Sequence, residues 1–120
     1  MLNLGSNDAD DDTDVAKGRF DVIAAQIVET LDSPDIIGLQ EIQNSDGSKI
    51  SDISCAEGTL QALIDAIIAA GGPQYAFIDT PDVPMTYIDE NGEAIRPVRG
   101  EPGGDIRIAF LCDTTRVSLV

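Results

Sequence analysis

The feature that most constrains this fold is a change in the period of the apolar residues at Asp32-Ser33-Pro34. Before that point, large apolar side chains recur at helical spacing, at Phe20, Ile23, Ile27 and Leu31. This spacing predicts a helix over 15–31, with Thr13 or Asp14 as its N-cap. After Pro34, a short aliphatic run predicts a strand over 35–42 that is buried on both faces. A strand entered directly from a helix favours an α/β domain.

The remaining elements follow the same rules. A second helix is expected over 57–70, with Ser54 and Glu57 at capping-box spacing and Gly71-Gly72 as the C-cap. Further strands are predicted over the ranges 74–79, 105–112 and 116–120. The proline-rich segment between the second and third strands predicts a long loop, with a small hairpin around Asn91-Gly92. Together these elements predict a layered α/β domain with helices covering one face of a sheet.

Charge and length limit the function. The chain has 120 residues, the size of one small domain, and a formal net charge of −15. Such a charge weakens any general attraction to nucleic acid, so a polyanionic substrate would need a local basic patch or a metal ion. No apolar run reaches the roughly 20 residues that a membrane-spanning helix requires, so no membrane span is expected. Cys55 and Cys112 allow either one disulfide or two buried thiols.

An acidic segment near the N-terminus raises the question of calcium. The alternation of aspartates from Asp8 to Asp14 partly resembles an EF-hand loop. That loop requires Gly at its sixth position and Glu at its twelfth, where this chain has Thr13 and Arg19. A solvated acidic loop is therefore the favoured interpretation, and a calcium-binding module for adhesion or assembly is the alternative.

Glu41 closes the first predicted strand. Strand parity places Ile37, Leu39 and Glu41 on one side and Ile42 on the other, so the carboxylate is in line with core residues. It also stands at the carboxyl end of the strand, where open α/β sheets place ligand crevices. The residues alone leave two interpretations equal: a functional carboxylate, or a side chain that has reached solvent as the strand leaves the sheet.

Three segments carry a resemblance to a known family. The segment SPDIIGLQEIQ, residues 33–43, resembles the metal-binding strand of the endonuclease/exonuclease/phosphatase superfamily. The segment GEPGGDIRIAFLCDTTRVSLV, residues 100–120, is similar to a later strand and turn in its secreted bacterial nuclease-like members. The segment RFDVIAAQIVETL, residues 19–31, lies where that family has a helix before its metal strand. The resemblance covers nearly the whole chain, from about Asn3 onward.

The resemblance implies a magnesium-dependent phosphoester hydrolase, most like a nuclease-type phosphodiesterase, that acts outside the cell. Glu41 would be the catalytic residue that holds Mg²⁺ or Mn²⁺, and a phosphoester, including nucleic acid, would be the substrate. The family domain is about twice as long, so residues 1–120 would be its N-terminal portion, incomplete at both ends, forming about the first half of a four-layer α/β sandwich. The sequence contains no histidine, although the family uses histidines in catalysis. The 120-residue chain alone is therefore expected to be inactive, and a related module that has lost its site is a further alternative.

Two other residues are candidates for lining the site. Asn3 matches an asparagine of the family's opening motif, although it could equally cap a loop. Arg107 alternates with Ile106 and Ile108, so it either pairs with an acidic neighbour or lines the cleft, and the many nearby carboxylates favour the ion pair. Neither the substrate nor a protein partner can be read from this sequence.

Overall fold

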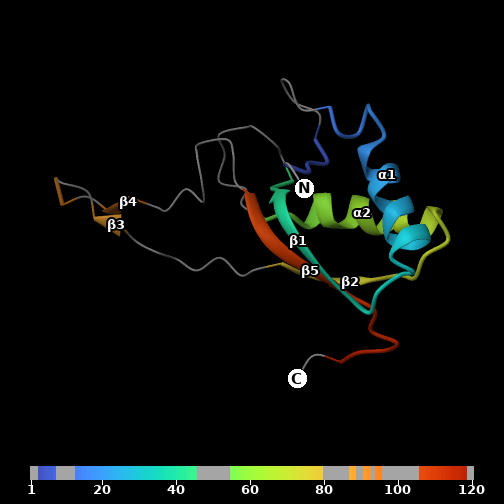
Figure 1. The fold of residues 1–120 in the computed structure, drawn as a ribbon. Coiled ribbons are helices and arrows are strands. Elements are labelled where there is room, and N and C mark those ends of the chain that lie inside the picture. Colours follow the sequence, from blue (N-terminus) through green and yellow to red (C-terminus); the bar gives the residue numbers. More distant parts are fainter. Residues whose placement is uncertain are drawn as a thin grey trace.

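The computed structural model describes residues 3–7, 13–45, 55–79, 87–88, 91–92, 94–95 and 106–118. Its centre is a three-stranded antiparallel sheet with the strand order β1-β5-β2. The strands are β1 (Ile36–Gln43), β2 (Ala76–Asp79) and β5 (Ile106–Cys112). The last strand in the chain therefore lies between the first two (Figure 1).

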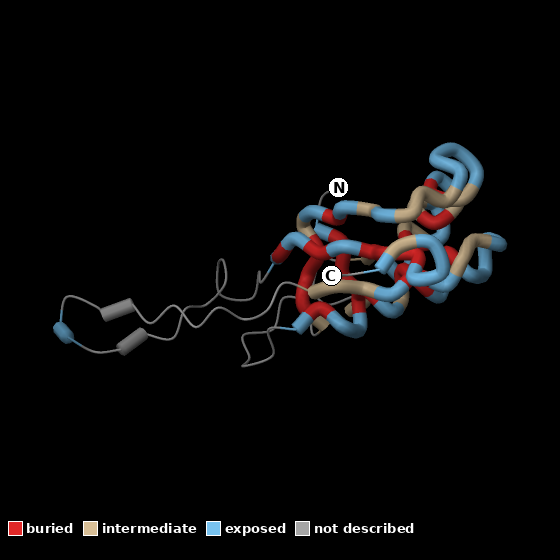
Figure 2. Tube along the Cα trace, turned by 90° about the horizontal axis from the view of Figure 1, so that it is seen from below, coloured by how far each residue is buried: buried red, intermediate tan, exposed pale blue. Residues whose placement is uncertain are grey.

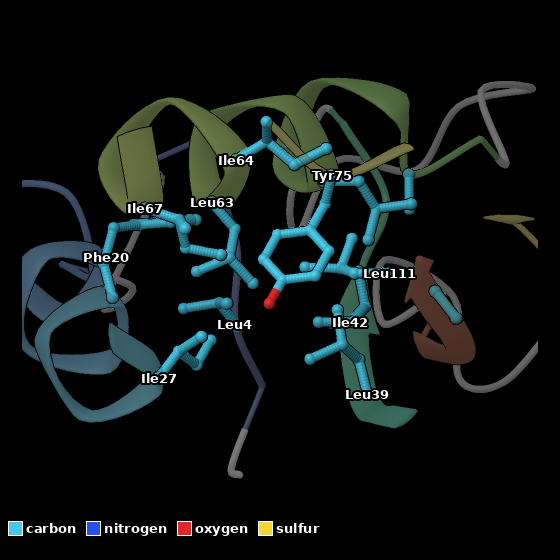
Figure 3. Packing of buried hydrophobic residues seen from close by; sticks show 14 residues of the cluster. Leu4, Phe20, Ile27, Leu39, Ile42, Leu63, Ile64, Ile67, Tyr75 and Leu111 are labelled. Atoms are coloured by element: carbon cyan, nitrogen blue, oxygen red, sulfur yellow. The ribbon is translucent and has the colours of Figure 1, made fainter. Parts of the chain in front are cut away.

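The helices cover one face of this sheet, as predicted (Figure 1). They are α1 (Arg19–Ala25), which continues as one turn of π-helix, η1 (Gln26–Thr30), and α2 (Glu57–Ala69). The core lies between these helices and the sheet, and Leu4 from the N-terminal segment is packed within it (Figure 3). The fully buried large side chains include Leu4, Ile42, Leu60, Leu63, Ile64, Ile67 and Leu111. The described residues thus form a mixed α/β domain.

The first helix begins later than predicted, at Arg19. Gly18 occupies its N-cap with φ 67°, a left-handed conformation that glycine adopts without a steric penalty. The residues before it form a turn in which the Arg19 N–H donates to the Asp14 carbonyl over 2.9 Å. The prediction of Thr13 or Asp14 as the N-cap was therefore wrong, because this turn separates both residues from the helix.

The second helix has the predicted extent, but tertiary contacts cap its start. The N–H of Ala56, the N-cap residue, donates to Oδ2 of Asp79 over 3.1 Å, and the Gly58 N–H donates to Oγ of Ser45 over 3.0 Å. Ser54, half of the predicted capping box, lies outside the described residues. The predicted glycine C-cap is confirmed, since Gly71 has φ 89° and its N–H donates to the Ile68 carbonyl over 2.9 Å.

The second face of the sheet is open, which contradicts the prediction that the first strand is buried on both faces. Exposed side chains from β1 and β5 line it, with exposed fractions of 56% for Ile36, 50% for Ile108 and 41% for Phe110. The described helices lie only on the opposite face (Figure 1), so alternate positions of β1 and β5 remain exposed, as the burial colours along the chain indicate (Figure 2). An uninterrupted apolar run in the sequence therefore did not signify two buried faces.

The chain after β5 turns instead of forming the strand predicted over 116–120. The N–H groups of Arg116 and Val117 both donate to the Asp113 carbonyl, over 3.1 and 3.0 Å. Oδ1 of Asp113 also accepts bonds from the Thr115 N–H and hydroxyl, at 2.9 and 2.7 Å. Residues 113–118 are therefore not a strand, because the Asp113 turn uses the backbone donors that would begin one; 119–120 lie outside the described residues.

The structure also bears on the predicted hairpin and on the question of a membrane-spanning helix. The small hairpin is confirmed as β3 (Tyr87–Ile88) paired antiparallel with β4 (Ala94–Ile95), and Gly92 in its turn has φ 81°. Within the described ranges, no helix has the length and apolar character to cross a membrane.

Candidate functional site

Glu41 lies at a β-bulge near the end of β1. The pairing of β1 with β5 runs regularly from Ile36 to Leu39, shifts, and resumes at Ile42 opposite Arg107. Glu41 has φ 58°, a left-handed conformation that is uncommon for a residue with a side chain. The extra residue places Ile42, which is 0% exposed, in the same core as Leu39. The predicted alternation of side chains is therefore wrong beyond Gln40, because the bulge interrupts the strand.

The N-terminal segment pairs with β1 at the bulge, as β5 does. Leu4 forms a parallel bridge with Ile42. Its N–H donates to the Glu41 carbonyl over 2.9 Å, and its carbonyl accepts the Gln43 N–H over 2.8 Å. Leu4 itself is fully buried, so the segment is held by both backbone pairing and packing. The prediction of a crevice at Glu41 applies to parallel sheets, in which the carboxyl ends of strands lie together. Here β1 and β5 are antiparallel, so the carboxyl end of β1 lies beside the amino end of β5.

The Glu41 carboxylate faces Asn3. Oε2 of Glu41 accepts a 3.2 Å hydrogen bond from the Asn3 backbone N–H. Glu41 is half-buried and Asn3 is exposed. Within the described residues, Oε1 of Glu41 has no hydrogen-bond partner and no cation pairs with this carboxylate. The structure thus brings together two of the predicted site residues, Glu41 and Asn3, and among the described residues nothing occupies Oε1.

A second pair of charged residues lies beside Asn3. Nη1 of Arg19 donates to Oδ1 of Asp14 over 2.7 Å and to the Asn3 carbonyl over 3.2 Å. Oδ2 of Asp14 accepts the buried Gly5 N–H over 3.0 Å. The sequence reasoning missed both residues as parts of the site, since Asp14 was assigned to capping or calcium and Arg19 only to the helix. The position of Arg19 at the start of the first helix was the only sequence signal for a role in the site, and a solvated arginine would give the same signal.

Arg107, the third candidate, belongs to an ion pair instead. Its side chain is 3% exposed, and Nη1 contacts both Asp79 oxygens, at 2.9 and 3.1 Å. The alternation with Ile106 and Ile108 and the favoured ion pair are both confirmed. The described contacts join Arg107 to Asp79 and the start of α2 and not to Glu41. Its Nε and Nη2 are buried without a hydrogen-bond partner in the described structure.

The donor set at Glu41 fits a hard divalent ion bound largely by water and substrate. Mg²⁺ commonly uses one or two protein carboxylates and retains several waters. The half-exposed Glu41 carboxylate, with Oε1 unpartnered among the described residues, meets that requirement. No group of three or more Asp, Glu, Cys or His suited to a metal occurs in the described part of the chain. Asp8, Asp10 and Asp12 of the possible calcium loop lie outside it.

The opposite end of the sheet holds two perturbed groups around a shallow hollow of about 410 Å³. Burial, followed by the nearby carboxylates of Asp113 and Asp35, raises the pKa of Tyr75, whose hydroxyl donates to the Pro34 carbonyl over 2.7 Å. The hydrogen bonds from Thr115 lower the pKa of Asp113. Because Cys112 of β5 pairs with Ile36 at the start of β1, this region is remote from Glu41.

The two cysteines are free thiols in the structure. Cys55 is exposed just before α2, and Cys112 is buried at the end of β5.

Comparison of the chain with known protein families, curated proteins and solved structures finds no significant match.

Proposed function

We propose that this chain is part of a metal-dependent phosphoester hydrolase, most like a nuclease-type phosphodiesterase, in which Glu41 is a ligand of Mg²⁺ or Mn²⁺. The observation that carries the proposal is the backbone of Glu41. A glutamate with φ 58° at a bulge directs its carboxylate to Asn3, and Oε1 has no hydrogen-bond partner among the described residues.

The left-handed backbone argues for a functional side chain. This conformation costs an L-residue roughly 1–2 kcal/mol, whereas glycine would adopt it freely. Strained non-glycine residues of this kind are concentrated at ligand and active sites. A structural ion pair would require a cation beside the carboxylate, yet its contact within the described structure is one 3.2 Å bond from the Asn3 N–H. The geometry therefore favours a ligand-binding role over an ion pair.

The chemistry of phosphoester cleavage explains the need for such a carboxylate. A bound Mg²⁺ polarises the phosphate and stabilises the charge that develops during displacement by water. In this chain, Glu41 would hold the ion through Oε1, while the Asn3 N–H fixes the orientation of Oε2. Arg19, whose charge is paired with Asp14, donates to the Asn3 carbonyl and would help to hold Asn3 in place.

The proposal extends to the architecture of the whole protein. The open apolar face and the small sheet support assignment of residues 1–120 to the first half of a layered α/β sandwich. The histidines expected for catalysis would belong to the remainder of that domain, since this chain has none. An extracellular location and a phosphoester substrate, including DNA or RNA, follow from the sequence resemblance.

The test is Glu41→Gln in the full-length protein, with Glu57→Gln, an exposed residue of α2, as the control for the change of charge. We expect hydrolysis of a model phosphodiester to fall by orders of magnitude and its Mg²⁺ requirement to rise in Glu41→Gln, with little change in Tm. The control should retain the parental rate and Mg²⁺ dependence. A Glu41→Gln protein with a much lower Tm and a normal rate while folded would overturn the proposal.

A further inference from the structure

We propose that Asp14 is a positioning residue for Glu41, acting through Gly5, Arg19 and Asn3 to set the affinity of Glu41 for a divalent ion. This inference rests on the proposed function, since it concerns the same site. It goes beyond that function because Asp14 touches neither the Glu41 carboxylate nor a substrate in the described contacts.

Asp14 is a nearly buried carboxylate that binds two separate segments of the chain. Its side chain is 9% exposed, although it is charged and lies near the polar N-terminal segment. Both carboxylate oxygens have partners: Oδ1 accepts Nη1 of Arg19 at 2.7 Å, and Oδ2 accepts the Gly5 N–H at 3.0 Å. A buried carboxylate that binds two separate segments restrains both.

Arg19 and Asn3 connect Asp14 to Glu41. The same Nη1 of Arg19 that binds Asp14 also donates to the Asn3 carbonyl over 3.2 Å. The Asn3 N–H in turn donates to Oε2 of Glu41 over 3.2 Å. One buried carboxylate thus restrains the segment on both sides of Leu4, at Gly5 directly and at Asn3 through Arg19.

Residues 3–5 in turn hold the backbone conformation of Glu41. Residues 3–5 lie along β1 through the two backbone bonds of Leu4, to the Glu41 carbonyl and from the Gln43 N–H. The left-handed backbone of Glu41 costs energy, and the two backbone bonds of Leu4 help to hold it. A restraint from Asp14 on residues 3–5 therefore acts on the bulge. Partners that orient a metal ligand commonly change metal affinity by about 10- to 100-fold.

The experiment uses the isotope-labelled 120-residue chain and its Asp14→Asn and Arg19→Gln variants. Asp21→Asn, an exposed aspartate of α1, is the control for charge. Metal binding is read from the broadening of the Asn3, Leu4 and Glu41 amide resonances by Mn²⁺, with Mg²⁺ as competitor. Glu41→Gln identifies the part of the broadening that belongs to this site. Exchange of the Leu4 and Gln43 amides with solvent, without metal, measures how firmly residues 3–5 lie on β1.

We expect Asp14→Asn and Arg19→Gln to weaken Mn²⁺ binding at Glu41 by about 10-fold or more. Exchange of the Leu4 and Gln43 amides should accelerate, while the Leu60 amide of α2 stays protected and shows that the domain remains folded. Asp21→Asn should match the parent chain in both measurements. Unchanged Mn²⁺ affinity in folded Asp14→Asn, with binding at Glu41 in the parent chain, would overturn the positioning role alone. Absence of Glu41-dependent binding in the parent chain would overturn the proposed function and this inference with it.

Discussion

The backbone N–H of Leu4 donates a 2.9 Å hydrogen bond to the carbonyl of Glu41, so a buried leucine near the N-terminus holds a glutamate at φ 58° in a distant strand. This contact makes the bulge a tertiary feature, formed when the N-terminal segment packs against β1. The free-energy cost of the left-handed backbone at Glu41 can therefore be measured through protein stability, without an activity assay.

Glycine should therefore be better tolerated than alanine at position 41. In an ordinary strand, glycine is less stable than alanine by roughly 0.5–1 kcal/mol. At φ 58° the order should reverse, since alanine retains the left-handed penalty of roughly 1–2 kcal/mol. Urea unfolding of Glu41→Gly and Glu41→Ala measures this difference. An alanine variant more stable than the glycine variant would show that position 41 is not left-handed in solution.

The Arg107–Asp79 pair should be costly to break on one side. Arg107 is 3% exposed, so Asp79→Ala leaves an uncompensated buried cation and should lower the free energy of unfolding by about 3–5 kcal/mol. The Asp79 carboxylate also accepts the Ala56 N–H at the start of α2, which adds to the loss. The double variant Asp79→Ala with Arg107→Met should recover much of the stability. Equal instability in the single and double variants would contradict the assignment of the cost to the charge.

The two faces of β5 should respond differently to substitution. Leu111 is fully buried, and Leu111→Ala should cost about 2–5 kcal/mol through lost burial and a residual cavity. Ile108 is 50% exposed on the open face, and Ile108→Thr should cost less than about 1 kcal/mol in the 120-residue chain. Chemical denaturation of both variants provides the comparison. Similar losses would mean that the face carrying Ile108 is covered in solution.

Acid should weaken the turn that follows β5. Hydrogen bonds from Thr115 lower the pKa of Asp113 below its ordinary value of 3.8, so the folded state favours the charged carboxylate. The stabilisation is present above the unfolded-state pKa and is lost as pH falls from about 3.8 through the lower folded-state pKa. Thermal unfolding between neutral pH and pH 2 should show a smaller acid-induced loss in Asp113→Asn than in the parent. Asp65→Asn in α2 controls for the charge, and an Asp113→Asn profile parallel to the parent's would contradict the prediction.

The 120-residue chain by itself should not cleave phosphodiesters. It contains no histidine to polarise an attacking water, and the described part offers one carboxylate at the proposed metal site. A model phosphodiester and plasmid DNA, each with Mg²⁺ or Mn²⁺, are the substrates to test. Turnover that disappears with EDTA and in Glu41→Gln would show that the catalytic groups lie within these residues.

Local sequence patterns predicted the regular elements well. The helical spacing before Pro34, the aliphatic run over 35–42 and the Gly71-Gly72 cap each depend on residues close in the chain, and α2, β1 and the C-cap formed as expected. The alternation around Arg107 also predicted that its side chain faces away from Ile106 and Ile108, and the many nearby carboxylates favoured its ion pair. These features are predictable because each depends on the identity and spacing of residues within a few positions of one another.

The candidate site was only partly predictable for the same reason. The resemblance and the end of the strand singled out Glu41, and a motif match suggested Asn3, yet neither pattern contained the bulge that joins them. That bulge depends on Leu4 bonding to a strand more than 30 positions later. Asp14 and Arg19 likewise gained their roles only when the turn before α1 packed against residues 3–5.

The sequence by itself thus determined where α2 and the strands β1, β2 and β5 begin and end to within about two residues, and that Glu41 lies near the end of the first strand. Only the tertiary structure decided that one sheet face is open, that Asp79 caps α2, and that Glu41 is turned toward Asn3. The physical reason is that burial, capping by distant carboxylates and a strained backbone all depend on contacts between segments far apart in the chain, and periodicity cannot encode such contacts.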